Sequence, residues 1–282
     1  MTVAVTTASG QLGSAIIQAL IPETGVGQVV GITRTPQKIV NPPVEIRKGD
    51  YNSKEEFDRA LQGVDVLMLV SGMDHPDKRI IQHRNVIQAA MDAGVRKIVY
   101  SSIIGKRGSS TFDPIVNSNR QTEQDIRESG LEWSIGRNGL YIEPDVEYIE
   151  VYKKEGKVAN SAGDGLCSYT TRGELAFAYG KMILHPDRNG HTFNLAGQAI
   201  SQVQLAGYLN LAFGTSLTYE SMTPEAYLAV QQKANGEFLG PIIAGIYQKI
   251  RSGEFEIESD YREAAGRIHL SWSSYFESLM GE

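Results

Sequence analysis

The sequence predicts an α/β fold in which a mostly parallel sheet is covered by helices on both faces. Strand-like and helix-like segments alternate through the first half of the chain, an order that builds strand–helix–strand crossovers. One segment, residues 65–71 (DVLMLVS), is nearly all apolar, as expected for a strand buried on both faces. With 41% hydrophobic and 21% charged residues, the composition is that of a folded globular protein.

The individual elements of the first half follow from local patterns. Short β-rich runs predict strands at residues 3–6, 28–34, 44–48, 65–71, 97–102 and 132–137. Helical spacing of apolar or polar residues predicts helices at residues 11–20, 53–61, 82–93 and 118–128. The helix at 53–61 opens on a serine cap and an acidic first turn, and Gly94 ends the helix at 82–93. In such sheets ligands bind at the carboxyl ends of the strands.

The second half has fewer and shorter strands. They are predicted at residues 157–161, 192–195 and 216–221. Helical patterns dominate and cover residues 172–184, 201–213, 224–233, 239–252 and 272–280. We therefore expect a smaller lobe that packs over the sheet and forms one wall of a cleft.

Composition and charge exclude several classes of protein. The single cysteine, Cys167, cannot build a disulfide framework or a multi-cysteine zinc site, and we expect no metal. The net charge of −6 and the absence of long Lys/Arg runs argue against a nucleic-acid partner. No stretch reaches the ~18 apolar residues of a membrane span. We expect a cytoplasmic protein with no membrane partner.

A glycine-bearing turn follows the first predicted strand and opens the first helix. It reads Thr7-Ala8-Ser9-Gly10-Gln11-Leu12-Gly13. Small residues here let backbone N–H groups approach a pyrophosphate, and the last glycine permits close packing of helix on strand. Gly10 and Gly13 take the second and third glycine positions of such a motif, while Thr7 takes the first. The alternative is an ordinary strand-to-helix turn without a ligand.

The end of the second strand predicts which dinucleotide is bound. An acid there would hold the ribose hydroxyls of NAD, whereas an arginine accommodates a 2′-phosphate. Arg34 lies 21 residues after Gly13, Lys38 adds a second cation, and no acid occurs between Val29 and Val44. We therefore expect NADP(H) rather than NAD(H), with a solvated basic turn as the alternative.

Taken together, several motifs resemble a known family. They are T-x-A-S-G-Q-L-G, G-I-T-R-T-P-x-K, K-G-D-Y, the run from Gln82 to Ser102, R-N-G-x-Y, A-G-D-G, T-R-G-E-L-A and T-F-N-L-A-G. Their order and spacing resemble the NmrA-like group of atypical short-chain dehydrogenases, in particular its bacterial NADPH-dependent quinone and triphenylmethane dye reductases. One departure is Thr7, where family members usually have glycine.

The resemblance implies a Rossmann-type, doubly wound parallel sheet over residues 1–142, with strands also contributed from about 157–197. Residues 143–282 would form a small α+β, mainly helical substrate lobe. It also implies a cofactor site that runs along the strand ends. Its residues would be Thr7, Ser9, Gly10, Gln11, Leu12, Gly13, Arg34, Lys38, Asp50, Tyr51, Ser71, Gly72, Met73, Ser101 and Ser102. Asn138, Gly139 and Tyr141 would lie by the nicotinamide and substrate.

The sequence lacks the usual alcohol dehydrogenase machinery. None of the 13 tyrosines has a lysine four residues later, which argues against alcohol–ketone chemistry by a Tyr–Lys pair. Hydride transfer to an electron-poor quinone or dye needs no strong buried acid. Tyr141 is the candidate for hydrogen bonding to a quinone oxygen, with Asn138 beside it; a purely structural tyrosine is the alternative. Phe238 opens an apolar stretch that could line a substrate pocket or simply start a helix.

Two functions remain open from the sequence. The first is an NADPH-dependent oxidoreductase that reduces a quinone-like small molecule. The second is a non-catalytic NADP(H)-binding sensor that contacts a regulatory protein. A homo-oligomer is compatible with either.

Overall fold

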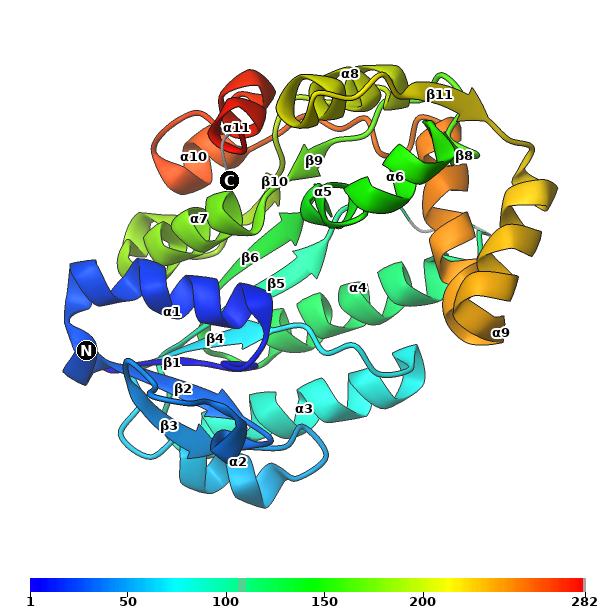
Figure 1. Ribbon diagram of the computed structural model, residues 1–282. Coiled ribbons are helices and arrows are strands. Elements are labelled where there is room, and N and C mark those ends of the chain that lie inside the picture. The colour runs from blue at the N-terminus through cyan, green and yellow to red at the C-terminus, as the bar shows by residue number, and fades with distance from the viewer. Residues whose placement is uncertain (107, 109, 281–282) are drawn as a thin grey trace.

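The computed structural model describes residues 1–106, 108 and 110–280, and it contains one seven-stranded parallel sheet (Figure 1). The strand order is β10-β6-β5-β4-β1-β2-β3. The strands are β1 (Val3–Val5), β2 (Val29–Thr33), β3 (Glu45–Lys48), β4 (Val66–Val70), β5 (Lys97–Ile103), β6 (Glu132–Asn138) and β10 (Thr192–Leu195). All six neighbouring pairs are parallel, which confirms the predicted Rossmann-type α/β fold.

The order of the sheet reverses between β1 and β4. From β1 the chain adds β2 and β3 on one side, and from β4 it adds β5, β6 and β10 on the other. Crossovers on the two sides leave a crevice at the carboxyl ends of the two central strands. This topology therefore fixes where a ligand site is expected.

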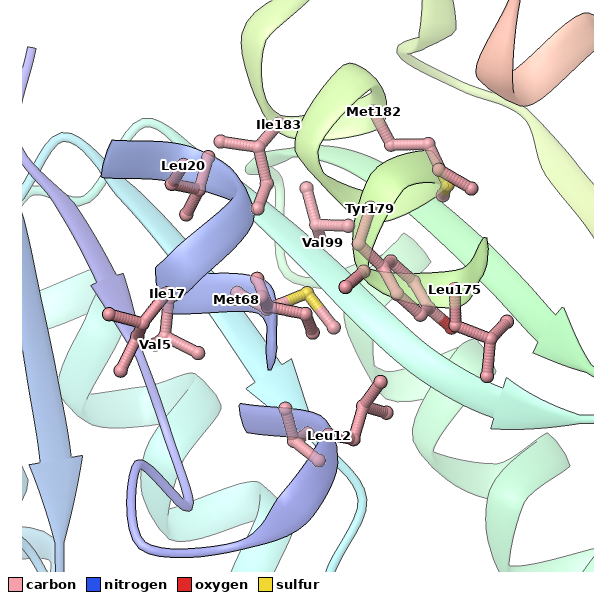
Figure 2. Close-up of a cluster of buried hydrophobic side chains, with 14 of the residues drawn as sticks. Val5, Leu12, Ile17, Leu20, Met68, Val99, Leu175, Tyr179, Met182 and Ile183 are labelled. Atoms are coloured by element: carbon pink, nitrogen blue, oxygen red, sulfur yellow. The ribbon is translucent and has the colours of Figure 1, made fainter. Parts of the chain in front are cut away.

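Helices cover both faces. On one face α1 (Gln11–Thr24) and α7 (Arg172–Leu184) share a core with the sheet. In this core Leu20 of α1 lies next to Ile183 of α7 (Figure 2). On the other face α2 (Lys54–Ala60), α3 (Pro76–Asp92) and α4 (Asp113–Glu128) share a second core with the sheet, which includes Phe57, Val86 and Ile126. Short 3-10 turns lie at Val26–Gln28, Pro36–Lys38 and Pro186–Arg188.

The rest of the second half forms a lobe with its own core, built around Phe255, Trp272 and Phe276. Its helices are α5 (Glu143–Glu147), α6 (Ile149–Glu155), α8 (Gln202–Phe213), α9 (Pro224–Arg251) and α11 (Trp272–Ser278). Helix α10 (Tyr261–Ala265) instead packs on α7 and β10 and joins the core of the main sheet. Two small parallel pairs join β8 (Lys157–Asn160) to β11 (Thr218–Ser221) and β7 (Leu140–Tyr141) to β9 (Tyr169–Thr170). No helix within the described ranges could cross a membrane.

The structure differs from the sequence predictions mainly at element ends. Helix α3 begins at Pro76 rather than residue 82, and α4 begins at Asp113 rather than 118. Each helix has a proline in its first turn, where proline is tolerated, and the first turn of α3 is also polar. The two helices expected at 224–233 and 239–252 are one element, α9, interrupted at Gly236 with φ 76°. The short elements α5, α6, α10, β7 and β9 were not predicted, since each is too brief to show a periodic pattern.

Candidate functional site

A cleft of about 830 Å³ opens at the carboxyl ends of β1, β2, β3 and β4, at the point where the sheet order reverses. Its size lies in the range of cofactor and ligand pockets. Its walls are made by Thr7, Ser9, Gly10, Gln11, Leu12, Thr33, Arg34, Thr35, Gly49, Asp50, Tyr51, Asn52, Phe57, Val70, Ser71, Gly72, Met73, Asp74, Gln82, Tyr141 and Arg172.

The turn after β1 is built so tightly that glycine is required at position 13. A Cβ on Gly13 would lie 2.4 Å from the carbonyl oxygen of Thr7 and 2.8 Å from that of Thr6. A Cβ on Gly10 would lie 3.2 Å from the Thr7 oxygen. Thr7 itself has φ 52°, a left-handed conformation that favours glycine and is rare for a β-branched residue. Gly13 therefore serves close packing, and Thr7 holds a conformation for which glycine is the usual residue.

Helix α1 begins at this turn without a side-chain cap. Gly10 is its N-cap residue and has extended backbone, and no side chain among the described residues caps its first turn. Gly10, Gln11 and Leu12 all line the cleft. Uncapped N–H groups at the positive end of a helix dipole form a natural site for a phosphate group. The start of α1 can therefore receive an anion from the cleft.

Arg34 stands at the end of β2, on the cleft wall and exposed to solvent. Within the described ranges its guanidinium makes no hydrogen bond or ion pair, so its donors are available to a ligand. Beside it, the Ser9 and Thr33 hydroxyls lie 2.9 Å apart and tie the glycine turn to β2. Lys38 is exposed on the 3-10 turn after Arg34 and does not line the cleft.

Asp50 and Tyr51, which follow β3, form the next part of the cleft wall. The Tyr51 hydroxyl lies 2.6 Å from both Thr6 Oγ1 and the Val70 carbonyl oxygen, which fixes its ring between β1 and β4. Burial raises the pKa of Tyr51, so its phenol stays protonated. Asp50 also lines the cleft, and its carboxylate accepts the backbone N–H of Asn52 at 2.9 Å.

The loop after β4 is held from behind by two buried side chains of α3. His83 Nε2 accepts the Gly72 N–H at 3.1 Å, and Arg79 donates to the Gly72 carbonyl oxygen at 3.2 Å. Burial and the nearby Arg79 charge lower the pKa of His83 to about 3, so the ring is neutral. Its Nδ1 then carries the proton and donates to Thr122 Oγ1. Gly72 is thus fixed against the cleft, while Met73 next to it is exposed.

Tyr141 and Arg172 close one end of the cleft. Asn138 Nδ2 donates to the Tyr141 hydroxyl oxygen at 3.3 Å, and Asn138 Oδ1 lies 2.5 Å from the hydroxyl of Tyr179. The Arg172 guanidinium lies over the Tyr141 ring, 5.5 Å from its centroid. Burial raises the pKa of Tyr141, against the lowering effects of Asn138 and Arg172. Tyr141 is therefore a protonated donor, and Asn138 orients it without lining the cleft.

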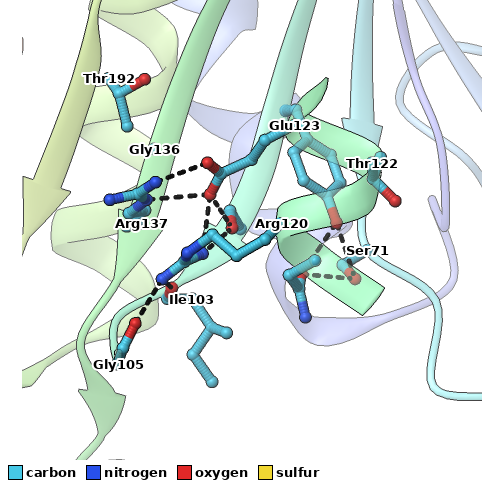
Figure 3. A network of polar contacts seen from close by, with 12 residues as sticks. Ser71, Ile103, Gly105, Arg120, Thr122, Glu123, Gly136, Arg137 and Thr192 are labelled. Carbon is cyan, nitrogen blue, oxygen red and sulfur yellow. Dashed lines mark hydrogen bonds and ion pairs between the residues drawn. The ribbon is translucent and has the colours of Figure 1, made fainter. Parts of the chain in front are cut away.

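Ser101 and Ser102, at the end of β5, use their hydroxyls within the protein. The Ser71 N–H donates to Ser101 Oγ, so Ser101 supports the cleft wall. Ser102 donates to Glu123 at 2.7 Å, within a buried network that also holds Arg120 and Arg137 (Figure 3). Burial alone would raise the pKa of Glu123, but the Arg137 and Arg120 guanidiniums and the Ser102 hydroxyl lower it to about 2.

The remaining predicted residues lie outside the cleft lining. Gly139 allows the chain to pass close to β9, since a Cβ there would lie 2.5 Å from the Ser168 carbonyl oxygen. Phe238 lies on α9, half exposed, and its ring contacts the ring of His75 in the β4–α3 loop, with the ring centroids 5.4 Å apart and the planes tilted by 30°. Cys167 is buried and unpaired, and no metal-binding cluster occurs among the described residues.

Several cleft residues were missed from the sequence. They are Thr33, Thr35, Gly49, Asn52, Phe57, Val70, Asp74, Gln82 and Arg172. Thr33 and Val70 end strands β2 and β4, and Thr35 and Gly49 follow closely after β2 and β3, so the strand-end rule could have found these four. Arg172 belongs to the T-R-G-E-L-A motif, but only the fold brings the start of α7 next to the start of α1.

Comparisons with known proteins identify relatives of this chain and solved structures that share its fold. A family model described as NAD(P)H-binding matches residues 7–164. Quinone oxidoreductase 2 of Escherichia coli is 33% identical over 238 residues, covering 83% of this chain and 82% of that protein. The structure of an Escherichia coli NADPH-dependent quinone oxidoreductase complexed with NADPH superposes with a TM-score of 0.88 at 28% identity, covering 99% of both chains. The triphenylmethane reductase of Citrobacter sp. does so at 0.89 and 29%, covering 100% of both chains.

The match spans the glycine turn, the strand-end cleft and the lobe, and it extends over more than half of the chain by each comparison. This chain belongs to the NAD(P)H-binding, NmrA-like family of oxidoreductases, as its motifs predicted.

Proposed function

We propose that this protein is an NADPH-dependent reductase that transfers hydride to a quinone or a similar electron-poor aromatic acceptor. The observation that carries the proposal is the pair of open anion sites on one cleft: the uncapped start of α1 and the unpaired guanidinium of Arg34. A dinucleotide with a 2′-phosphate presents two anionic groups that such a pair can bind. The relatives that bear quinone oxidoreductase names support the choice of acceptor.

The residues of the cleft suit the cofactor from one end to the other. The N–H groups at the start of α1 would hold the pyrophosphate, and Arg34 would hold the 2′-phosphate, with Lys38 adding charge nearby. Asp50 and Tyr51 would border the adenine. Ser71, Gly72 and Met73 would follow the chain of the cofactor toward the nicotinamide, near the support given by Ser101.

The acceptor would lie at the end of the cleft closed by Tyr141. When bound, the reduced nicotinamide supplies the hydride, and the protein has to hold the two rings together and exclude water. Asn138 donates to the Tyr141 oxygen, which leaves the phenol proton of Tyr141 to point toward an acceptor oxygen.

The test is the oxidation of NADPH by the purified protein, followed by the absorbance of the reduced nicotinamide. The panel contains benzoquinones, naphthoquinones, triphenylmethane dyes and azo dyes, each with NADPH and with NADH. We expect acceptor-dependent oxidation with at least one quinone, and faster turnover with NADPH than with NADH. Tight binding of NADPH with no acceptor-dependent oxidation across the panel would contradict the proposal and favour a non-catalytic sensor.

A further inference from the structure

Arg172 is a charged side chain of the cleft that has no part in the phosphate contacts proposed above. It begins α7, its side chain is 17% exposed, and it lies on the cleft wall beside Tyr141. Its Nη1 donates to Glu147 Oε1 at 2.9 Å. Among the described residues its Nε and Nη2 have no hydrogen-bond partner. The cation therefore faces the cleft with donors to spare.

The contact between Arg172 and Tyr141 is through the ring. The guanidinium carbon lies 5.5 Å from the centroid of the Tyr141 ring, close enough for a cation–π attraction. A cation in this place stabilises negative charge on the phenol oxygen. The other charged group near Tyr141 is Glu143, whose Oε1 accepts the backbone N–H of Arg172 and whose charge acts in the opposite sense.

The hydrogen bonds around Tyr141 leave one direction open. Asn138 Nδ2 donates to the phenol oxygen, and the Asn138 amide is itself held by Tyr179. No group in the described part of the chain accepts the phenol proton of Tyr141. The Tyr141 O–H can therefore donate only into the cleft.

We propose that Arg172 is a positioning residue that acts through Tyr141, and that the two serve acceptors whose oxygen gains negative charge during reduction. This inference rests on the proposed function. The quinone gains a hydride, two electrons and a proton, from the reduced nicotinamide, whose C–H bond breaks. Its carbonyl oxygen gains a second proton from Tyr141, so that hydroquinone and oxidised cofactor are the products. Water returns a proton to the Tyr141 oxygen, and Arg172 stabilises that oxygen while it is charged.

A cationic triphenylmethane dye provides an internal control for this role. The dye takes up hydride at its central carbon and becomes neutral, so no oxygen gains charge and no proton is needed. Loss of Arg172 or Tyr141 should slow the reduction of a quinone and leave the reduction of the dye almost unchanged. A purely structural defect would slow both reactions.

The experiment is a double-mutant cycle with Tyr141→Phe, Arg172→Met and the double variant, measured with menadione and with crystal violet at saturating NADPH. General acid catalysis is worth roughly 10²–10⁴-fold, so we expect Tyr141→Phe to lower kcat for menadione by at least ~100-fold. We expect Arg172→Met to lower it by about tenfold and to have no further effect when Tyr141 is already Phe. KM for NADPH should stay within about twofold, and Arg172→Lys should recover most of the lost kcat.

Two matched controls separate the cation from its surroundings. Glu147→Gln removes the exposed ion-pair partner of Arg172 but keeps the cation, and Lys181→Met removes a cation that lies over Phe177 on the same helix, away from the cleft. Both variants should behave like the wild type. Thermal unfolding identifies variants that do not fold, in which case Arg172→Gln replaces Arg172→Met in the cycle and Arg172→Lys remains the rescue variant.

Additive losses in the double variant would overturn the inference, as would equal losses with menadione and crystal violet. If the wild type reduces no quinone, the proposed function fails first. If it reduces menadione but not crystal violet, the cycle with menadione decides alone.

Discussion

Helices α1 and α7 pack side by side and both begin at the cleft, but their first turns differ. In α7 the Thr171 hydroxyl accepts the Glu174 N–H, and the Glu143 carboxylate accepts the Arg172 N–H at 2.6 Å. In α1 the N-cap is Gly10, and no side chain caps the turn. Because buried helix ends need partners, the closed start of α7 is structural, and we propose that the open start of α1 receives the ligand.

The arginine side chains also divide into those paired within the protein and those open to a ligand. Arg120 and Arg137 are paired with Glu123 inside the protein, between α4 and β6. Arg34 has no partner in the described part of the chain and stands on the cleft wall. A charge with a partner inside the fold contributes to the stability of that fold, whereas a charge without one is available to a ligand. Five substitutions test this division between closed and open groups.

Glu123→Gln should have the largest effect, because it breaks a closed network. Removing one partner of a buried ion pair costs about 3–5 kcal/mol. The pKa of Glu123 is lowered to about 2 from its usual 4.5, so its stabilisation is complete above pH 4.5 and is lost as the pH falls toward 2. Urea unfolding from pH 7 to pH 3 should show a wild-type advantage that shrinks with acidity. A constant difference at all pH values would contradict this.

Gly13→Ala should have the second largest effect, because it disturbs the turn at the uncapped start of α1. The new Cβ would press on the Thr7 and Thr6 carbonyl oxygens, and overpacking of this kind costs about 1–3 kcal/mol. We also expect NADPH binding, measured by calorimetry, to weaken at least tenfold, about 1.4 kcal/mol. The matched control is Gly173→Ala in the first turn of α7, where the nearest atom is Thr171 Oγ1 at 3.8 Å. Equal losses in both variants would show that the two turns are equivalent.

Arg34→Ala should weaken NADPH binding by about 1.5–3 kcal/mol, the value of a hydrogen bond to a charged group. NADH binding should stay nearly unchanged, since it lacks the 2′-phosphate. Lys38→Ala is the control, and it should cost less because Lys38 lies outside the cleft lining. The same loss of affinity for both cofactors would place the 2′-phosphate away from Arg34.

Thr171→Ala tests the closed helix start. Losing an N-cap side chain typically costs about 0.5–2 kcal/mol of unfolding free energy. We expect that loss in thermal or urea unfolding, together with an NADPH dissociation constant within twofold of the wild type. A large loss of cofactor affinity would mean that the α7 cap also serves the ligand.

Thr7→Gly should have the smallest effect. Glycine relieves the left-handed conformation of Thr7, worth about 1–2 kcal/mol, but it adds about 0.5–1 kcal/mol of chain entropy to lose on folding. The protein should therefore become slightly more stable, with cofactor affinity almost unchanged. A clear destabilisation would show that the Thr7 side chain contributes contacts that outweigh its strain.

The sequence predicts much of the fold and part of the division between groups paired within the protein and groups open to a ligand. The parallel sheet, the glycine turn and Arg34 follow from local patterns and strand-end positions, because each depends on residues close together in the chain. Arg172 was not predictable, since its place beside Tyr141 depends on the packing of α7 against α1. Nor was the role of Ser102, which looks like a cleft residue by position but donates to Glu123, a partner set by the packing of α4 on β5.

The most direct test of the contrast between α1 and α7 is a crystal structure of the protein with NADP⁺ bound. We expect density for the pyrophosphate at the N–H groups of Gln11 and Leu12, and for the 2′-phosphate beside Arg34. A pyrophosphate at the start of α7, or a 2′-phosphate remote from Arg34, would contradict the account.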